Sequence, residues 1–262
     1  PVTSVPQGYD LGDLGQQPIR IYKQRQPNFI LFEGEGAVTD LTDLEYAEAF
    51  ETLFEKISVE YPFTREKDID WEGLYEEFSP RIEAARTDAG FYRVMHDFIL
   101  RIPDGHVGMT IDPDIFFEDQ GGSFGLLLRE LSDGRVVVLQ VFPGTPAARE
   151  GIEVGAEITF WGGQPIEQAV RNVEPYFGPY STPHHKRLGQ VTFLTRTSPG
   201  EKVEISYENP GQQEVTTTMT ADIEYDSLFA AIEAWNQDEL LLPVEGEVLD
   251  EAGIGYVVIS TF

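Results

Sequence analysis

Residues 121–163 read GGSFGLLLRELSDGRVVVLQVFPGTPAAREGIEVGAEITFWGG, and this stretch decides the fold. Two short apolar runs, at residues 124–128 and 136–141, lie on either side of a Ser-Asp-Gly sequence at 132–134. A polar turn with a glycine between two apolar runs is typical of a β-hairpin. The stretch therefore predicts two antiparallel strands joined by a tight turn.

A short helix and a third strand are predicted after the hairpin. Thr145 suits the N-cap and Pro146 the first helical position, and the helix at 147–150 ends at Gly151. An apolar run at 158–161 then predicts a strand that two glycines terminate. Together these elements predict a compact, β-rich module.

The start of this module resembles a PDZ domain. Ser123-Phe124-Gly125-Leu126 resembles its carboxylate-binding loop, in which backbone N–H groups receive the terminal carboxylate of a peptide. The run GTPAAREGIEVG at 144–155 is similar to the sequence of PDZ domains in bacterial proteases, although alanine follows where that family usually has aspartate. The resemblance implies that these four loop residues bind a peptide that lies along an exposed strand edge.

Ser123 also fits a second motif. Residues 121–125 read GGSFG, which matches the G-x-S-x-G elbow that carries the nucleophile of many hydrolases. That elbow needs a strand before the serine and a helix after it. Here a polar segment at 118–120 reads as a loop and an apolar strand follows, so we expect Ser123 to be a loop residue and an esterase to be a minor alternative.

The composition restricts the possible partners and chemistry. The 262 residues include 46 acidic and 18 basic side chains, a formal net charge of −28, and no cysteine. Such a charge repels nucleic acids and anionic membranes, so neither is an expected partner. The absence of cysteine excludes disulfides, thiolate metal sites and a cysteine nucleophile. The length predicts one to three domains, and no apolar run is long enough for a membrane span.

Three apolar stripes with helical spacing precede the module. They lie at residues 46–61, 71–78 and 88–99, and Pro80 is expected to end the second helix. Three such helices in about 60 residues predict a small bundle whose aromatic faces form its core. Residues 1–40 read as an N-terminal arm or a small β element.

Further elements are expected after the module. Apolar patterns predict helices at 166–173 and 184–194 and a second hairpin formed by 203–207 and 215–219, which would complete a PDZ-like β-barrel. The last stretch, 253–262, reads as a buried strand that stops at the end of the sequence. Because a buried strand needs neighbours on both sides, we expect the chain to be a fragment that ends where an α/β domain begins.

The order of these parts resembles the carboxyl-terminal processing family of serine peptidases, which includes the tail-specific proteases and the tricorn core protease. Three segments carry the resemblance: ARTDAGFYRV at 85–94, RIPDGHV at 101–107 and GYVVISTF at 255–262. It implies an α+β protein with a helical bundle, a PDZ-like β-barrel and the first strand or strands of a truncated catalytic α/β domain. The expected boundaries are an arm at 1–40, the bundle at 41–112, the PDZ-like domain at 113–225, and a linker with the start of the catalytic domain at 226–262.

His106 occupies the position at which the tricorn-like branch of this family has a histidine after the helical bundle. The resemblance implies that His106 is the general base of the intact peptidase, since imidazole titrates near neutral pH and can deprotonate a serine hydroxyl. The alternative is a loop residue beside the third helix. The family's nucleophile lies beyond residue 262, so none is assigned, and this chain alone is expected to be inactive.

The remaining expectations follow from the same resemblance or from missing motifs. We expect protein or peptide C-termini as substrates, a location outside the cytoplasm, and no cofactor, because no nucleotide or zinc motif is present. His96 is expected to be a solvated surface residue, and the adjacent pair His184-His185 a surface pair without a metal. A complete, non-catalytic PDZ-type scaffold remains the alternative function.

Overall fold

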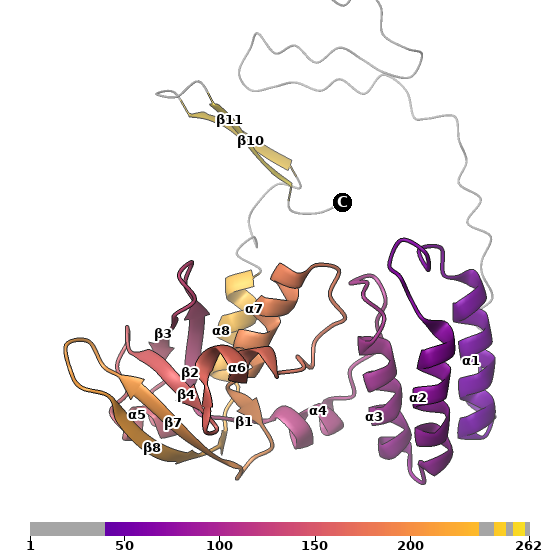
Figure 1. The fold of residues 1–262 in the computed structure, drawn as a ribbon, viewed down its shortest axis with the longest axis horizontal. Helices are drawn as coiled ribbons and strands as arrows, with labels where there is room; N and C mark the ends of the chain where they lie inside the picture. The colour runs from indigo at the N-terminus through magenta and orange to yellow at the C-terminus, as the bar shows by residue number, and fades with distance from the viewer. Residues whose placement is uncertain (1–39, 236–243, 250–253, 260–262) are drawn as a thin grey trace, which may run out of the picture. The chain divides into compact units, whose positions relative to one another are not determined.

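The computed structural model describes residues 40–235, 244–249 and 254–259 (Figure 1). Residues Leu41–Trp235 form one compact unit. Strands β10 (Val244–Leu249) and β11 (Ile254–Ile259) pair with each other as an antiparallel hairpin, which is described by itself. The strand expected at 253–262 is therefore present over 254–259, and its described partner precedes it in the sequence.

The unit begins with three helices, as predicted: α1 (Tyr46–Glu60), α2 (Trp71–Ala84) and α3 (Asp88–Leu100). Their apolar faces meet in one core. Its buried members are Phe50, Phe54, Phe78, Ile82, Met95, Phe98, Ile99 and Ile102. Several of these rings meet edge to face or tilted, the geometry that aromatic pairs favour.

Helix α2 does not stop before Pro80, and that prediction was wrong. Phe78 and Ile82 lie on either side of the proline and are almost completely buried. Burying two such side chains contributes about 1.5–3 kcal/mol each, which offsets the roughly 3 kcal/mol that an internal proline costs a helix.

A fourth helix, α4 (Pro113–Gln120), replaces the loop that was expected at 118–120. The carboxylate of Asp112 caps it by accepting hydrogen bonds from the first N–H groups of the helix. Arg93 of α3 forms ion pairs with Glu118 and Asp119 of α4, so the polar residues at its end contact the bundle and not solvent alone.

The larger sheet is antiparallel, with the strand order β2-β3-β4-β7-β8 and with β5 paired to β4. Its strands are β2 (Leu126–Glu130), β3 (Val136–Val141), β4 (Glu157–Trp161), β5 (Gln164–Pro165), β7 (Lys202–Glu208) and β8 (Val215–Thr220). Both predicted hairpins are confirmed as β2–β3 and β7–β8. The sheet is open and not a closed barrel, so among the described residues β2 is an edge strand that pairs with β3 alone.

A second, smaller sheet holds the segment that leads into β2. Its order is β6-β1-β9, formed by Arg196–Thr197, Gly122–Ser123 and Asp222–Ile223. Ser123 therefore lies in a short central strand and not in a loop, because its backbone pairs with strands on both sides.

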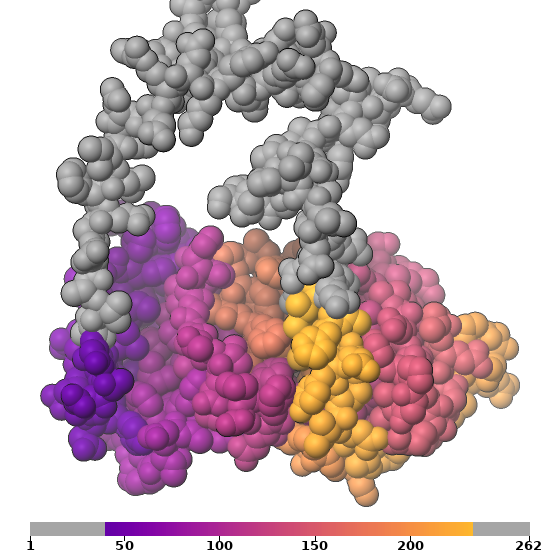
Figure 2. Space-filling view, turned by 180° about the vertical axis from the view of Figure 1, so that it is seen from behind, coloured from indigo at the N-terminus to yellow at the C-terminus, as the bar shows by residue number. Residues whose placement is uncertain are grey.

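Four helices complete the unit: α5 (Pro146–Arg149), α6 (Ile166–Arg171), α7 (Pro183–Phe193) and α8 (Asp226–Trp235). Helices α7 and α8 both pack against β2. In Figure 2 the yellow helix α8 lies on this face between the helical region and the sheet region. Thr145 is the N-cap residue of α5 and Pro146 its first residue, as predicted, but the Thr145 side chain makes no cap hydrogen bond. Its hydroxyl donates to the carbonyl of Phe142 at 2.6 Å instead.

His96 joins the helical region to the sheet region, and the prediction of a solvated histidine was wrong. The residue is 7% exposed, its ring stacks on Tyr176 with centroids 4.1 Å apart, and its Nε2 lies 3.0 Å from the carbonyl oxygen of Tyr176. Burial lowers the pKa of His96, because a charged imidazolium would lose its hydration there.

Candidate functional site: a groove along the edge strand and a histidine loop

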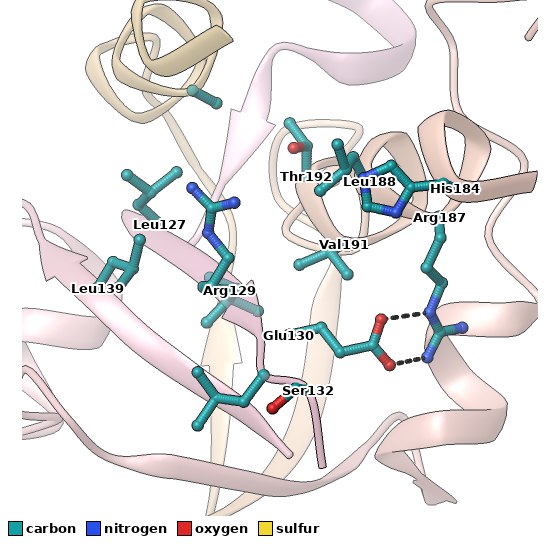
Figure 3. A pocket seen from close by; sticks show the side chains of 13 residues that line it. Leu127, Arg129, Glu130, Ser132, Leu139, His184, Arg187, Leu188, Val191 and Thr192 are labelled. Atoms are coloured by element: carbon teal, nitrogen blue, oxygen red, sulfur yellow. Dashed lines mark hydrogen bonds and ion pairs between the residues drawn. The ribbon is translucent and has the colours of Figure 1, made fainter. Parts of the chain in front are cut away.

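A groove of about 360 Å³ runs between the edge strand β2 and helix α7 (Figure 3). Strand β2 and its turn, strand β3 and helices α7 and α8 contribute its walls. The lining residues are Leu127, Leu128, Arg129, Glu130, Leu131, Ser132, Leu139, His184, Arg187, Leu188, Val191, Thr192 and Ala231. A groove beside an unpaired strand edge is the geometry that binds an extended peptide as an additional strand.

The backbone of β2 offers hydrogen-bonding groups to this groove. At its two ends the carbonyl of Gly125 and the N–H of Leu131 bond toward β3. Backbone groups alternate in direction along an antiparallel strand. The even-numbered residues between them therefore direct their backbone groups away from β3: Leu126, Leu128 and Glu130.

The groove walls combine apolar side chains with polar ones, and a charged pair lies across one part. Arg187 of α7 donates two hydrogen bonds of 2.7 Å to the carboxylate of Glu130 on β2 (Figure 3). Both side chains are about three-quarters covered, and this hydrogen bonding raises the pKa of Arg187. Arg129 projects into the space between β2 and α7, and among the described residues its guanidinium has no acidic partner. The ion pair fixes α7 to β2, while Arg129 supplies a positive charge that no acidic side chain of the described residues neutralises.

The expected carboxylate-binding residues lie at the start of β2. Ser123, Phe124 and Leu126 are each less than 3% exposed, so their side chains belong to the core. Gly125 has φ +75° and its N–H donates to the Ser123 hydroxyl at 3.0 Å. Only backbone groups of this segment remain for a ligand.

Ser123 lacks the surroundings of a nucleophile. It is completely buried, it follows helix α4 and it precedes strand β2, which is the reverse of the order that the hydrolase elbow needs. Its hydroxyl lies 3.3 Å from that of Ser227, at the start of α8, and no histidine contacts it. The esterase alternative has no geometric support.

His106 lies on the turn after α3. Its side chain is 96% exposed, and its Nδ1 lies 3.1 Å from Oδ1 of the buried Asp104. The backbone N–H of His106 donates to the same oxygen at 3.0 Å, and the hydroxyl of Tyr61 donates to Oδ2 at 2.5 Å. These hydrogen bonds, that of Tyr61 first, hold the pKa of Asp104 well below its usual range.

The histidine turn is tied to the segment before α7. The N–H of Gly105 donates to the hydroxyl of Ser181 at 2.8 Å, and that hydroxyl lies 3.4 Å from Oδ1 of Asp104. The next residue, Thr182, caps α7 by accepting from the N–H of His185. Among the described residues no hydrogen bond joins His106 to the segment at 123–126, so the two predicted sites are separate features linked through α7.

Sequence reasoning missed four parts of these sites: the ion pair of Glu130 with Arg187, the carboxylate of Asp104, and the hydroxyl groups of Tyr61 and Ser181. Only Asp104 had a local signal, because it stands two residues before His106. His184 and His185 are exposed, as expected, and in the described part of the chain no cluster of three or more His, Asp or Glu side chains is placed to hold a metal ion. No helix in that part is long and apolar enough to cross a membrane.

Two family models match this chain. The model of the tricorn protease C1 domain matches residues 42–99, and the PDZ domain model matches residues 114–174. No curated protein sequence matches.

Solved structures share the fold at low sequence identity. Mature CPAF is 14% identical with a TM-score of 0.51, and its complex with lactacystin is 13% identical with a TM-score of 0.52. In both cases the match covers 68% of this chain and 34% of the CPAF chain, so the chain spans about a third of that protein. The photosystem II D1 C-terminal processing protease matches 78% of this chain and 46% of its own at 16% identity, but its TM-score of 0.30 is too low to support an argument. The chain thus carries a segment that matches the tricorn protease C1 domain, followed by one that matches a PDZ domain, and this order fits the carboxyl-terminal processing family of serine peptidases.

Proposed function

We propose that this chain is the substrate-binding part of a serine endopeptidase that grips the C-terminal segment of a protein or peptide. The groove between β2 and α7 is the observation that carries the proposal, because it combines an unpaired strand edge with leucine side chains on its walls. Backbone hydrogen bonds to β2 would give affinity without regard to sequence. Leu127, Leu139 and Leu188 would favour apolar side chains at alternate positions of the peptide.

The segment Ser123-Phe124-Gly125-Leu126 is proposed to receive the terminal carboxylate of the bound peptide. Its side chains are buried, so the N–H groups at the start of β2 would make the contact. A positive charge on Arg129 in the same groove favours an anionic ligand in a chain whose net charge is −28.

His106 is proposed to be the general base in a protein that also supplies the serine nucleophile. Its exposed ring can approach a partner group that the described residues do not contain. The resemblance to this family implies a location outside the cytoplasm, and we propose that location here. The rival is a PDZ-type scaffold without catalysis, which would use the same groove and leave His106 without a role.

Peptide titration tests the groove and the carboxylate claim separately. Isothermal titration of the chain with an apolar C-terminal peptide, as free acid and as amide, should show tighter binding of the free acid. Leu188→Lys in the groove should abolish binding of both, whereas Val59→Lys, at a site on α1 that is 83% exposed, should not change it. Equal affinity for acid and amide would remove the carboxylate claim, and unchanged binding by Leu188→Lys would remove the groove.

Hydrolysis tests the catalytic claim in the full-length protein. His106→Gln should abolish cleavage of a peptide that the variant still binds through the groove. A full-length protein that binds peptides and cleaves none would favour the scaffold.

A further inference from the structure

The turn that carries His106 contains a buried anion. Asp104 is 5% exposed in a chain of strongly negative charge, and such burial is costly unless hydrogen bonds compensate it. The structure supplies donors from three segments: Tyr61 at the end of α1, Ser181 before α7, and the backbone and ring of His106. This number of donors keeps the carboxyl group ionised, in agreement with its low pKa.

An ionised carboxylate decides which ring nitrogen of His106 carries the proton. It can accept hydrogen bonds but cannot donate them, so the Nδ1 atom that lies 3.1 Å from Oδ1 must be the protonated one. In the neutral ring Nε2 is then the free base, and the 96% exposure of the side chain leaves it accessible. A histidine side chain in water favours the opposite tautomer, with its proton on Nε2, so the contact reverses the intrinsic preference.

The carboxylate is itself fixed in position. The backbone N–H of Asp104 donates to the carbonyl of Ile102 at 2.7 Å, and its own carbonyl accepts from Val107 at 3.0 Å. The hydroxyl of Tyr61 holds Oδ2, so the carboxylate cannot rotate away from His106 without losing that bond. An exposed imidazole that would otherwise sample several rotamers is thus held by an acceptor anchored on two sides.

We propose that Asp104 is a positioning residue that holds His106 in the Nδ1–H tautomer and directs its Nε2 outward, with Tyr61 and Ser181 anchoring the carboxylate. In nucleophilic catalysis a general base is commonly oriented by a third group that hydrogen-bonds to it, and Asp104 would have that role toward His106. The catalytic consequence rests on the proposed function of His106; the tautomer does not, because it follows from this chain alone.

Long-range ¹H–¹⁵N NMR of the histidine side chains tests the tautomer in the chain as it stands, without any substrate. The signals of His106 are assigned by their loss in His106→Gln, and spectra are recorded at a pH at which the ring is neutral. We expect the pattern of a protonated Nδ1 in the wild type and a shift toward a protonated Nε2 in Asp104→Ala. The matched control is Tyr61→Phe, which removes the donor to Oδ2 but keeps the acceptor. It should retain the wild-type tautomer, because the backbone N–H of His106 and the hydroxyl of Ser181 still hold Oδ1 of Asp104.

These outcomes separate the positioning role from a merely structural one. If neutral wild-type His106 carries its proton on Nε2, the proposal is overturned, and this result needs no variant to fold. If Tyr61→Phe changes the tautomer as much as Asp104→Ala does, general loosening of the turn explains the effect and the positioning role is overturned.

Activity of the full-length protein gives the second readout. Asp104→Ala should lower kcat by roughly 100-fold with little change in KM, because base catalysis contributes 10²–10⁴-fold. Asp104 does not line the groove, and the ion pair of Arg187 with Glu130 still holds α7 against β2 in this variant. Unchanged kcat would contradict the positioning role. A wild-type protein with the Nδ1–H tautomer that cleaves no peptide would contradict the proposed peptidase function and leave the positioning of His106 established.

Discussion

Replacement of Gly125 by alanine should destabilise the chain through two separable effects. The residue has φ +75°, a conformation that costs a residue with a side chain about 1–2 kcal/mol. A Cβ at this position would also lie 2.2 Å from both Cβ and Oγ1 of Thr145. Overpacking of a core by a methyl group costs about 1–3 kcal/mol. The two effects sum to a loss of about 2–5 kcal/mol for Gly125→Ala, a large part of the stability of a typical domain.

Gly134→Ala is the matched control. Gly134 lies in the β2–β3 turn with φ +87°, and a Cβ there would meet nothing within 4 Å, so only the conformational cost of about 1–2 kcal/mol applies. Urea unfolding followed by tryptophan fluorescence measures both variants, and the ring of Trp161 packs against Phe124 next to the substituted site. Thr145→Gly should recover part of the loss when added to Gly125→Ala and should be destabilising by itself. Equal losses of stability in Gly125→Ala and Gly134→Ala would refute the close approach of Thr145 to Gly125.

Three further outcomes are expected from the charged groups. A double-mutant cycle of Glu130→Ala and Arg187→Ala, measured by urea unfolding, should give a coupling of about 1 kcal/mol, and no coupling would contradict the ion pair across the groove. The pKa of folded His96 lies below its unfolded value of about 6.5, so the unfolded state binds more protons near that pH. The free energy of unfolding should therefore fall as the pH drops through about 6.5, and this pH dependence should be absent in His96→Gln. Because the pKa of folded Asp104 is depressed, its contribution to stability is present above about pH 4 and is lost as the pH falls further. In Asp104→Asn the free energy of unfolding should therefore fall less on acidification than in the wild type. An unchanged acid transition would contradict the buried carboxylate.

The parts of the fold that were predicted correctly are those whose signal is local. Helices α1 and α3 follow from apolar residues that recur every three to four positions, and both hairpins follow from alternation around a turn. The end of α2 was predicted too early, before Pro80. The burial of Phe78 and Ile82, which depends on the neighbouring helices, outweighs the local cost of proline. Helix α4 was missed because its acidic end faces Arg93, a partner 25 and 26 residues away in the sequence.

The candidate sites divide in the same way. His106 was predicted from a short motif, and the segment at 123–126 from a glycine between apolar residues; both assignments remain predictions. The hydroxyl groups of Tyr61 and Ser181 that fix Asp104 stand 43 and 77 residues from it, and no periodicity could associate them with it. His96 was placed on the surface because the helical stripe of α3 excludes it; its covering residue, Tyr176, comes from the sheet region.

The contacts at α7 decide whether the groove and the histidine turn can act independently. One end of α7 is joined to the histidine turn, since Ser181 binds Gly105 and Asp104 immediately before the helix begins. Further along, Arg187 of the same helix is paired with Glu130 on the groove's strand. A helix of eleven residues is rigid over its length of about 16 Å, so displacement of α7 from β2 must strain the bonds at Ser181 or break them. A peptide that enters the groove therefore meets a wall whose position is coupled, through a single helix, to the carboxylate that orients His106.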